Sequence, residues 1–246
     1  MHIARDRRRL APVVAAGLFL IGIGSVLPIP QFARAEGTTV SRPGDFVDID
    51  RVVPAIRKDI RYFTANNFVG EKIDGYRAAK CLLTARAAEA LKRVQAELKP
   101  FGLGLKVYDC YRPQRAVNHF IRWAKDLNDT RMKRRFYPDV DKKDLFKEGY
   151  IAARSSHTRG STVDLTLVAI GADGGVRDVD MGTGYDLFSP GSWPTSARMS
   201  GGQRAHRMLL QTLMIKHGFA PYPQEWWHFT LKNEPYPKTY FDFPVE

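Results

Sequence analysis

Residues 155–164 read Ser-Ser-His-Thr-Arg-Gly-Ser-Thr-Val-Asp, with a histidine and an aspartate seven positions apart. Gly160 and the Thr162-Val163 pair disfavour a helix and favour a turn that leads into a strand. Such a turn would fold His157 back toward Asp164. Imidazole and carboxylate are both zinc ligands, although a histidine and an aspartate in a loop are more often ordinary polar surface. The stretch therefore predicts a turn, a strand and a candidate metal site.

The pattern around this stretch predicts an α+β fold. Val163, Leu165 and Leu167 alternate with smaller or polar residues, which is typical of a strand over 162–168. Further strands are predicted at 60–62, 103–108 and 226–231, and helices at 84–98, 113–127 and 202–216. Several connections are too short for parallel crossovers. We therefore expect a single domain with a mainly antiparallel central sheet flanked by helices.

A second motif, Glu225-Trp226-Trp227-His228, offers another imidazole and a carboxylate. A catalytic zinc needs three protein ligands, an open position for water and a nearby base. On a regular strand, residues 225 and 228 point to opposite faces. Glu225 must therefore lie on the loop before the strand, or a bulge must redirect it. The alternative is an aromatic core strand with a structural histidine.

Together, the two motifs resemble those of the zinc D-Ala-D-Ala peptidases, and most closely the VanX-type D-alanyl-D-alanine dipeptidases. That family carries S-x-H-x-x-G-x-x-x-D and E-x-x-H, which stand here at 155–164 and 225–228. Residues 108–113 resemble its D-x-Y-R-P segment, residues 180–182 its D-M-G segment, and residues 59–68 its N-terminal region. The resemblance covers about residues 46–240.

The resemblance implies a hedgehog/D-Ala-D-Ala peptidase-like fold with one zinc ion per chain at the sheet. It implies three metal ligands: His157, Asp164 and His228. Glu225 would act as general base and then general acid, and Arg112 would stabilise the developing oxyanion. Ser155 and Asp180 would bind the dipeptide, with Asp180 near its free ammonium. An aspartate in a glycine-rich loop can equally form an Asx turn.

The predicted function is zinc-dependent hydrolysis of D-alanyl-D-alanine, or a similar D,D-dipeptide, to free amino acids during the turnover of cell-wall peptides. One alternative is a D,D-carboxypeptidase that trims the terminal D-Ala from longer wall peptides. Another is a non-catalytic zinc-binding wall module. Glu225 and Arg112 argue against that module, because a structural zinc site needs neither a base nor an oxyanion-stabilising cation.

The first 35 residues have the pattern of a secretory signal peptide. Basic residues precede an apolar run over 10–27, and Ala33-Arg34-Ala35 resembles a cleavage site. A retained membrane anchor is the alternative. We expect residues 36–45 to be a flexible leader and residues 46–246 to be the catalytic domain of an exported, periplasmic or extracytoplasmic protein. No stable membrane insertion is expected after cleavage.

The two cysteines, Cys81 and Cys110, are both in the predicted mature chain. In an oxidising compartment such an isolated pair favours one disulfide. Two buried free thiols are the alternative. A zinc site made of these two residues alone is not expected, because a structural site needs four ligands.

The basic composition first raises the question of nucleic-acid binding. The chain has 38 Lys and Arg against 26 Asp and Glu, for a net charge of +12. Removal of residues 1–35 leaves +8 over 211 residues. A basic run at 131–135 is followed by acidic residues over 139–144, which is typical of a solvated surface. We therefore expect a small dipeptide as the partner and no nucleic acid.

Overall fold

The computed structural model describes residues 42–246. The predicted signal peptide at 1–35 and residues 36–41 of the predicted leader lie outside the described residues. Within 42–246, no helix is long and apolar enough to cross a membrane.

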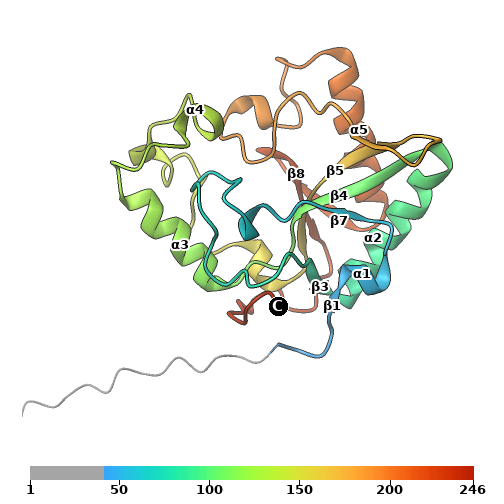
Figure 1. The fold of residues 1–246 in the computed structure, drawn as a ribbon, viewed down its shortest axis with the longest axis horizontal. Helices are drawn as coiled ribbons and strands as arrows, with labels where there is room; N and C mark the ends of the chain where they lie inside the picture. Colours follow the sequence, from blue (N-terminus) through green and yellow to red (C-terminus); the bar gives the residue numbers. More distant parts are fainter. Residues whose placement is uncertain (1–41) are drawn as a thin grey trace, which may run out of the picture. The chain divides into compact units, whose positions relative to one another are not determined.

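A mixed, mostly antiparallel sheet forms the centre of the domain (Figure 1). Its strand order is β2-β4-β5-β8-β7, and β6 pairs with a further stretch of β5. Only the β2–β4 pair is parallel among the strands described. The strands are β2 (Arg57–Lys58), β4 (Leu103–Asp109), β5 (Thr162–Ile170), β6 (Val176–Asp178), β7 (Phe219–Tyr222) and β8 (Glu225–Leu231). A separate small sheet pairs β1 (Phe46–Asp48) with β3 (Leu82–Thr84).

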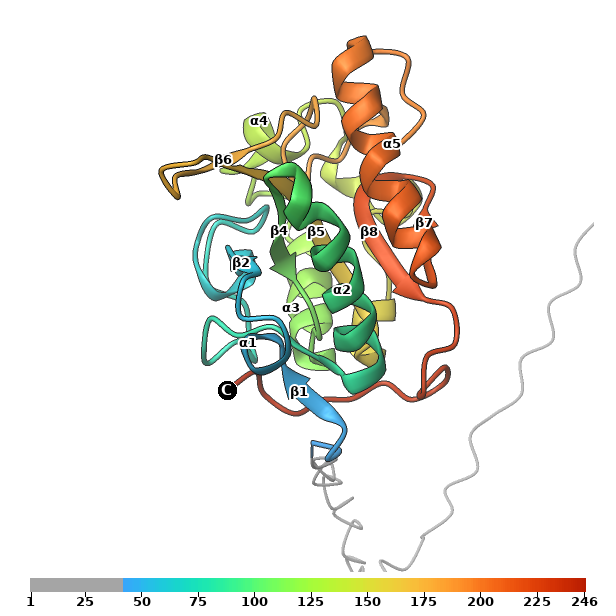
Figure 2. The same cartoon turned by 90° about the vertical axis from the view of Figure 1, so that its right-hand side faces the viewer.

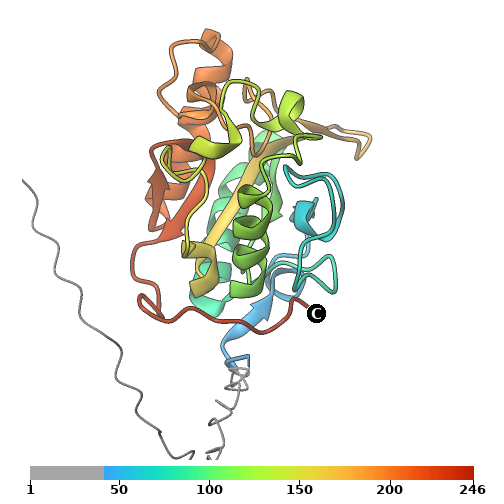
Figure 3. The ribbon, with the colours of Figure 1, turned by 90° about the vertical axis from the view of Figure 1, so that its left-hand side faces the viewer.

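Helices cover both faces of the sheet. Figure 2 shows α2 (Ala85–Leu98) and α5 (Gly201–Lys216) side by side on one face, and Figure 3 shows α3 (Gln114–Lys125) on the other. α5 begins at a capping box in which the side chains of Ser200 and Gln203 bond to each other's backbone N–H groups. Two short helices, α1 (Ile49–Val52) and α4 (Lys133–Phe136), complete the set.

The alternation along β5 separates the core from the functional face. Val163, Leu165 and Leu167 are fully buried on the side that α2 and α5 cover. Asp164 has the opposite parity, and it lines a cavity together with Val117 and other residues of α3. The sheet therefore supplies the hydrophobic core with one face and the candidate site with the other.

The predicted α+β class and mainly antiparallel sheet are confirmed, and the long helices and strands lie within a few residues of their predicted ends. The predicted strand at 60–62 is wrong, because a 3-10 turn occupies Arg61–Phe63 and the strand, β2, lies earlier. Four further strands, β1, β3, β6 and β7, were not predicted. Each is only three or four residues long, too short for an alternating pattern to stand out.

Candidate active site

Three acidic or imidazole side chains lie in a row across the centre of the sheet. Asp164 on β5 is directly opposite Asp109 on β4 and His228 on β8. The register of β4 shifts between Val107 and Asp109, and this irregularity brings Asp109 opposite Asp164. Directly opposed residues of antiparallel strands have neighbouring side chains. Strand pairing alone therefore places His228 beside Asp164, although they are 64 positions apart in the chain.

His157 reaches the same place through the turn that precedes β5. It lies in a 3-10 turn, Ser156–Arg159, whose N-terminus is capped by the hydroxyl of Ser155. Gly160 ends the turn in the left-handed conformation, with φ of +83°, and a Cβ there would lie 2.2 Å from the ring of Phe46. The turn predicted from the sequence is thus confirmed, and glycine is required at its end for both conformation and space.

The three candidate ligand atoms form a nearly equilateral triangle. Asp164 Oδ1 is 3.2 Å from His157 Nε2 and 3.1 Å from His228 Nδ1, and the two nitrogens are 3.2 Å apart. Tetrahedral zinc with ligand distances of about 2.0–2.1 Å separates its ligands by about 3.3 Å. Asp164 Oδ1 is also buried without a hydrogen-bond donor among the described residues. The donor set and this unsatisfied oxygen both fit a bound metal ion.

Each histidine is oriented by its other ring nitrogen. His157 Nδ1–H donates to the carbonyl of Cys110 at 2.7 Å, which leaves Nε2 free as a ligand. Burial lowers the pKa of His157, so that its ring stays neutral, as metal binding requires. His228 Nε2 lies 3.1 Å from the Ser156 hydroxyl, which leaves Nδ1 facing Asp164. Both rings therefore present a lone pair to the centre of the triangle.

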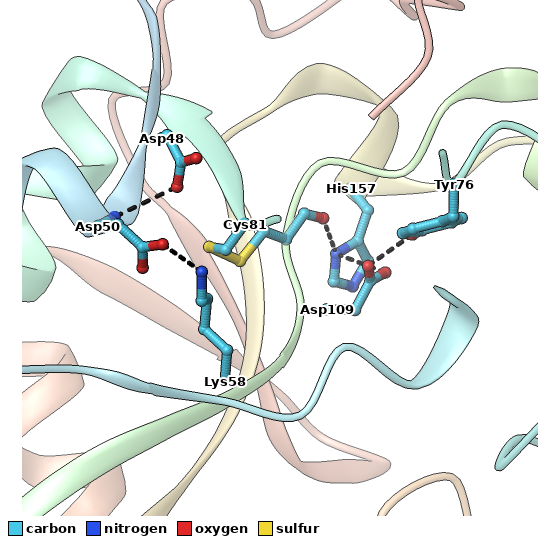
Figure 4. The surroundings of a disulfide bond; sticks show 8 residues. Asp48, Asp50, Lys58, Tyr76, Cys81, Asp109 and His157 are labelled. Atoms are coloured by element: carbon cyan, nitrogen blue, oxygen red, sulfur yellow. Dashed lines mark hydrogen bonds and ion pairs between the residues drawn. A yellow bond between two sulfur atoms is a disulfide. The ribbon is translucent and has the colours of Figure 1, made fainter. Parts of the chain in front are cut away.

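Cys110, whose carbonyl orients His157, forms a disulfide with Cys81 (Figure 4). Both cysteines are buried, and Cys110 follows Asp109 at the end of β4. Cys81 immediately precedes β3. The cross-link therefore ties the chain before β3 to the backbone that supports the first candidate ligand.

Glu225 is the first residue of β8 and follows the two-residue turn at Pro223-Gln224. The β7–β8 register shifts between Pro221 and Tyr222, so that Tyr222 pairs with Glu225. This irregularity supplies the predicted change of direction, and both Glu225 and His228 line the same cavity. Glu225 Oε2 lies 3.5 Å from His228 Nδ1. Burial raises the pKa of Glu225, which suits a group that accepts and then returns a proton near neutral pH.

Arg112 lies between β4 and α3, and its guanidinium points into the cavity. Its Nε donates to Asp109 Oδ2 at 2.9 Å, and its Nη2 lies 3.6 Å from Asp164 Oδ2. The rings of Tyr62 and Phe120 lie 4.9 and 5.3 Å from its Cζ. A guanidinium held in this way adds a fixed positive charge beside the ligand triangle.

The ligand triangle, Glu225 and Arg112 lie at one cavity of about 380 Å³, and Ser155 also lines it. The structure does not bring Asp180 there. The Asp180 side chain is exposed and accepts hydrogen bonds from Gly182 N at 2.8 Å and from Gln203 Nε2 at 2.9 Å. Asp180 thus forms the Asx turn that the sequence offered as the alternative role. Its bond to Gln203 of α5 holds it outside the cavity.

Asp186 lines the cavity instead, although no sequence motif pointed to this residue. The residue is buried at a positive φ of 60°, and burial raises the pKa of its carboxyl well above the ordinary value. Tyr62 OH donates to Asp186 Oδ2 at 2.9 Å, and Tyr185 OH donates to Asp164 Oδ2 at 3.0 Å. The two tyrosine oxygens are 3.2 Å apart. Asp186 is thus linked to the candidate metal ligand Asp164 through two hydroxyls.

Comparison with known proteins agrees with this geometry. A family model described as D-Ala-D-Ala dipeptidase, of peptidase family M15, matches residues 42–246. The chain belongs to this dipeptidase family. D-alanyl-D-alanine dipeptidases from Streptomyces coelicolor and Enterococcus faecium are 45% and 38% identical to it, over 82% of this chain and 98% of each relative. A D-alanyl-D-alanine dipeptidase from Escherichia coli is 30% identical over 76% of this chain and 84% of the relative.

Membership of the dipeptidase family makes the chain a metallopeptidase, and the triangle of His157, Asp164 and His228 is its candidate metal site. A dipeptide substrate follows from the family. The same stretch of chain contributes the turn, the strand and two of the three candidate ligands. The features that define the fold of this dipeptidase are therefore also those that build its site.

Proposed function

We propose that this dipeptidase uses one zinc ion, held by His157, Asp164 and His228, to hydrolyse D-alanyl-D-alanine or a similar D,D-dipeptide to free amino acids. The observation that carries the proposal is the buried triangle of ligand atoms with Glu225 at its edge. Two imidazoles and one carboxylate with an open position are a common ligand set of catalytic zinc. A zinc site that served structure alone would not need a neighbouring base.

Zinc, when bound, makes a water molecule acidic enough to ionise near neutral pH and polarises the carbonyl that is attacked. Glu225 accepts the proton of that water and returns it to the amine of the departing D-alanine. The peptide C–N bond breaks, one water is consumed, and two amino acids leave. The raised pKa of Glu225 favours acceptance of the proton and its retention until the amine departs, because a very weak base would not hold it between the two steps.

Arg112 stabilises the negative charge that develops on the carbonyl oxygen during attack. Its guanidinium is fixed by Asp109 and by the rings of Tyr62 and Phe120, so that little reorganisation is needed at the moment of reaction. Removal of one such preorganised donor typically lowers kcat by about 10²–10³-fold.

Asp186 is the partner we assign to the free ammonium of the dipeptide. Its carboxyl is buried and lines the cavity, and no Lys or Arg side chain forms an ion pair with it among residues 42–246. A substrate ammonium would supply the missing opposite charge. This role favours dipeptidase over D,D-carboxypeptidase activity, because a longer wall peptide presents a neutral amide at the equivalent position.

The proposed site of action is outside the cytoplasmic membrane, in the turnover of cell-wall peptides. The signal-like pattern of residues 1–35 supports export. The Cys81–Cys110 disulfide supports an oxidising compartment as well.

A substrate panel tests the proposal. The purified protein is assayed with D-Ala-D-Ala, N-acetyl-D-Ala-D-Ala, a wall pentapeptide and L-Ala-L-Ala, each with and without a chelator, and zinc is then added back. Cleavage of the free D,D-dipeptide alone, lost with chelator and restored by zinc, is the expected result. Release of D-Ala from the pentapeptide would favour the carboxypeptidase. No cleavage of any peptide, with one zinc bound, would favour the non-catalytic module.

A further inference from the structure

Arg154 is a charged residue of the cavity for which the mechanism has no use. Apart from the candidate metal ligands, the residues of charged type that line the cavity are Arg112, Arg154, Asp186 and Glu225. Arg112 is paired with Asp109, Glu225 is the base and Asp186 faces the substrate ammonium. Within residues 42–246, no carboxylate lies within ion-pair distance of Arg154. The cavity therefore has one cation left without an acidic partner.

The segment that carries Arg154 is anchored on both sides. The carbonyl of Ala153 accepts a hydrogen bond from Gln114 Nε2 at 3.1 Å, and Ser155 caps the turn that carries His157. The guanidinium itself lies over the ring of Tyr240, with Cζ 4.9 Å from the ring centroid. Backbone anchoring and stacking on Tyr240 reduce the number of conformations that Arg154 can adopt, and so reduce the entropy lost when it binds an anion.

The position of Arg154 complements that of Asp186. Asp186 is buried and bonded to Tyr62, whereas Arg154 is exposed and stacked on Tyr240. The cavity thus has an acidic group at a buried position and a cationic group at an exposed one. A free dipeptide is a zwitterion with an ammonium at one end and a carboxylate at the other, which matches this separation of charge.

We propose that the Arg154 guanidinium binds the C-terminal carboxylate of the dipeptide and makes the enzyme selective for substrates with a free C-terminus. This inference rests on the proposed dipeptidase function. Arginine matches a carboxylate with two parallel N–H donors, and it keeps its charge at every pH of interest. Because Arg154 is exposed, solvent weakens its interaction with the carboxylate. We therefore expect this interaction to lower KM by only about tenfold.

The test compares D-Ala-D-Ala with D-Ala-D-Ala-amide, which lacks the terminal charge. In the wild-type holoenzyme, kcat/KM is expected to be about tenfold higher for the acid than for the amide. Arg154→Gln should lose this preference through a higher KM for the acid, with kcat/KM for the amide unchanged within about twofold. Arg154→Lys should keep part of the preference, because its charge is retained. Arg177→Gln, on the exposed strand β6 outside the cavity, is the matched control.

A binding measurement separates recognition from chemistry. D-Ala-D-Ala and its amide are each titrated by calorimetry into zinc-loaded Glu225→Gln protein, with and without Arg154→Gln. Arg154→Gln should weaken the affinity for the acid by about tenfold and leave the affinity for the amide unchanged. The role of Arg154 would be overturned if Arg154→Gln kept the wild-type ratio of kcat/KM between acid and amide, or if it lowered kcat/KM equally for both substrates. Failure of the wild-type enzyme to cleave either substrate would instead refute the dipeptidase function, and the Arg154 proposal with it.

Discussion

The two sides of the cavity are built in different ways. The strand side consists of Asp164, His228 and Glu225 on β5 and β8, with His157 on the turn that enters β5. Its side chains are placed by register and supported by further hydrogen bonds. The loop side consists of residues 149–155 and 186–188, which carry Arg154 and Asp186. In the proposed mechanism, the strand side performs the chemistry, whereas the loop side selects the substrate.

The largest effect is expected at the base on the strand side. Glu225→Gln removes the proton acceptor while keeping the size of the side chain, and kcat should fall by about 10³-fold or more. The variant should still bind about one zinc ion, because Glu225 is not among the three candidate ligands. Steady-state kinetics and metal analysis of the same preparation measure both quantities. Full activity in this variant would contradict the mechanism.

The cross-link beneath the strand side is the next strongest test. The Cys81–Cys110 bond joins residues 29 positions apart, and its loss in the Cys81→Ser/Cys110→Ser protein should cost about 3–4 kcal/mol of unfolding free energy. The variant should also bind zinc more weakly, by about 10-fold or more, because the disulfide holds in place the Cys110 backbone carbonyl that orients His157.

Urea unfolding of the metal-free proteins and competition with a zinc chelator give the two values. Wild-type protein treated with reductant while unfolded, and then refolded, is the control. An unchanged zinc affinity in the double variant would show that the support of His157 does not depend on the disulfide.

On the loop side, a smaller effect that depends on pH is expected at Asp186. Burial raises the pKa of this carboxyl in the folded protein, so that the folded state binds more protons than the unfolded state above about pH 4. The contribution of the Asp186 carboxyl to the free energy of unfolding therefore falls as the pH rises above about 4. Asp186→Asn removes the dependence, and it should stabilise the metal-free protein at pH 7 by about 1–3 kcal/mol.

Urea unfolding at pH 7 and at pH 4 checks this prediction. The gain from Asp186→Asn should shrink toward pH 4, where the wild-type carboxyl is protonated in the folded state and about half protonated in the unfolded state. A gain of equal size at both pH values would show that charge burial is not its cause.

The smallest effect is expected at Asp180. Its carboxylate is exposed and bonded to Gly182 and Gln203 outside the cavity, so Asp180→Asn should change kcat and KM by less than about twofold. Steady-state kinetics with D-Ala-D-Ala give both constants, and Asp186→Asn serves as the contrasting variant. A large rise in KM for Asp180→Asn would return the ammonium-binding role to this residue.

The same contrast explains what the sequence could predict. The candidate ligands His157, Asp164 and His228 could be predicted because their two motifs resemble those of a known family. A glycine turn and strand alternation supported the placement of the first two. In the loop, Asp180 and Asp186 are six residues apart in similar surroundings, and no periodicity distinguishes them. Their placement depends on α5, which holds Asp180, and on Tyr62, which binds Asp186. These are tertiary contacts that a local pattern does not encode.

The hydroxyls of Tyr185 and Tyr62 connect two carboxylates through a chain of oxygens that has few hydrogens to share. Three close oxygen pairs connect Asp164, Tyr185, Tyr62 and Asp186, but the two hydroxyls contribute only two hydrogens. With both carboxyls ionised, one of the three pairs lacks a hydrogen, and a proton on Asp186 supplies it. A substrate ammonium brings hydrogens of its own to Asp186 and can take the place of that proton. If the substrate ammonium binds Asp186 as proposed, the free enzyme and the enzyme with substrate differ in how hydrogens are shared along one chain of oxygens, and that chain ends on a candidate metal ligand.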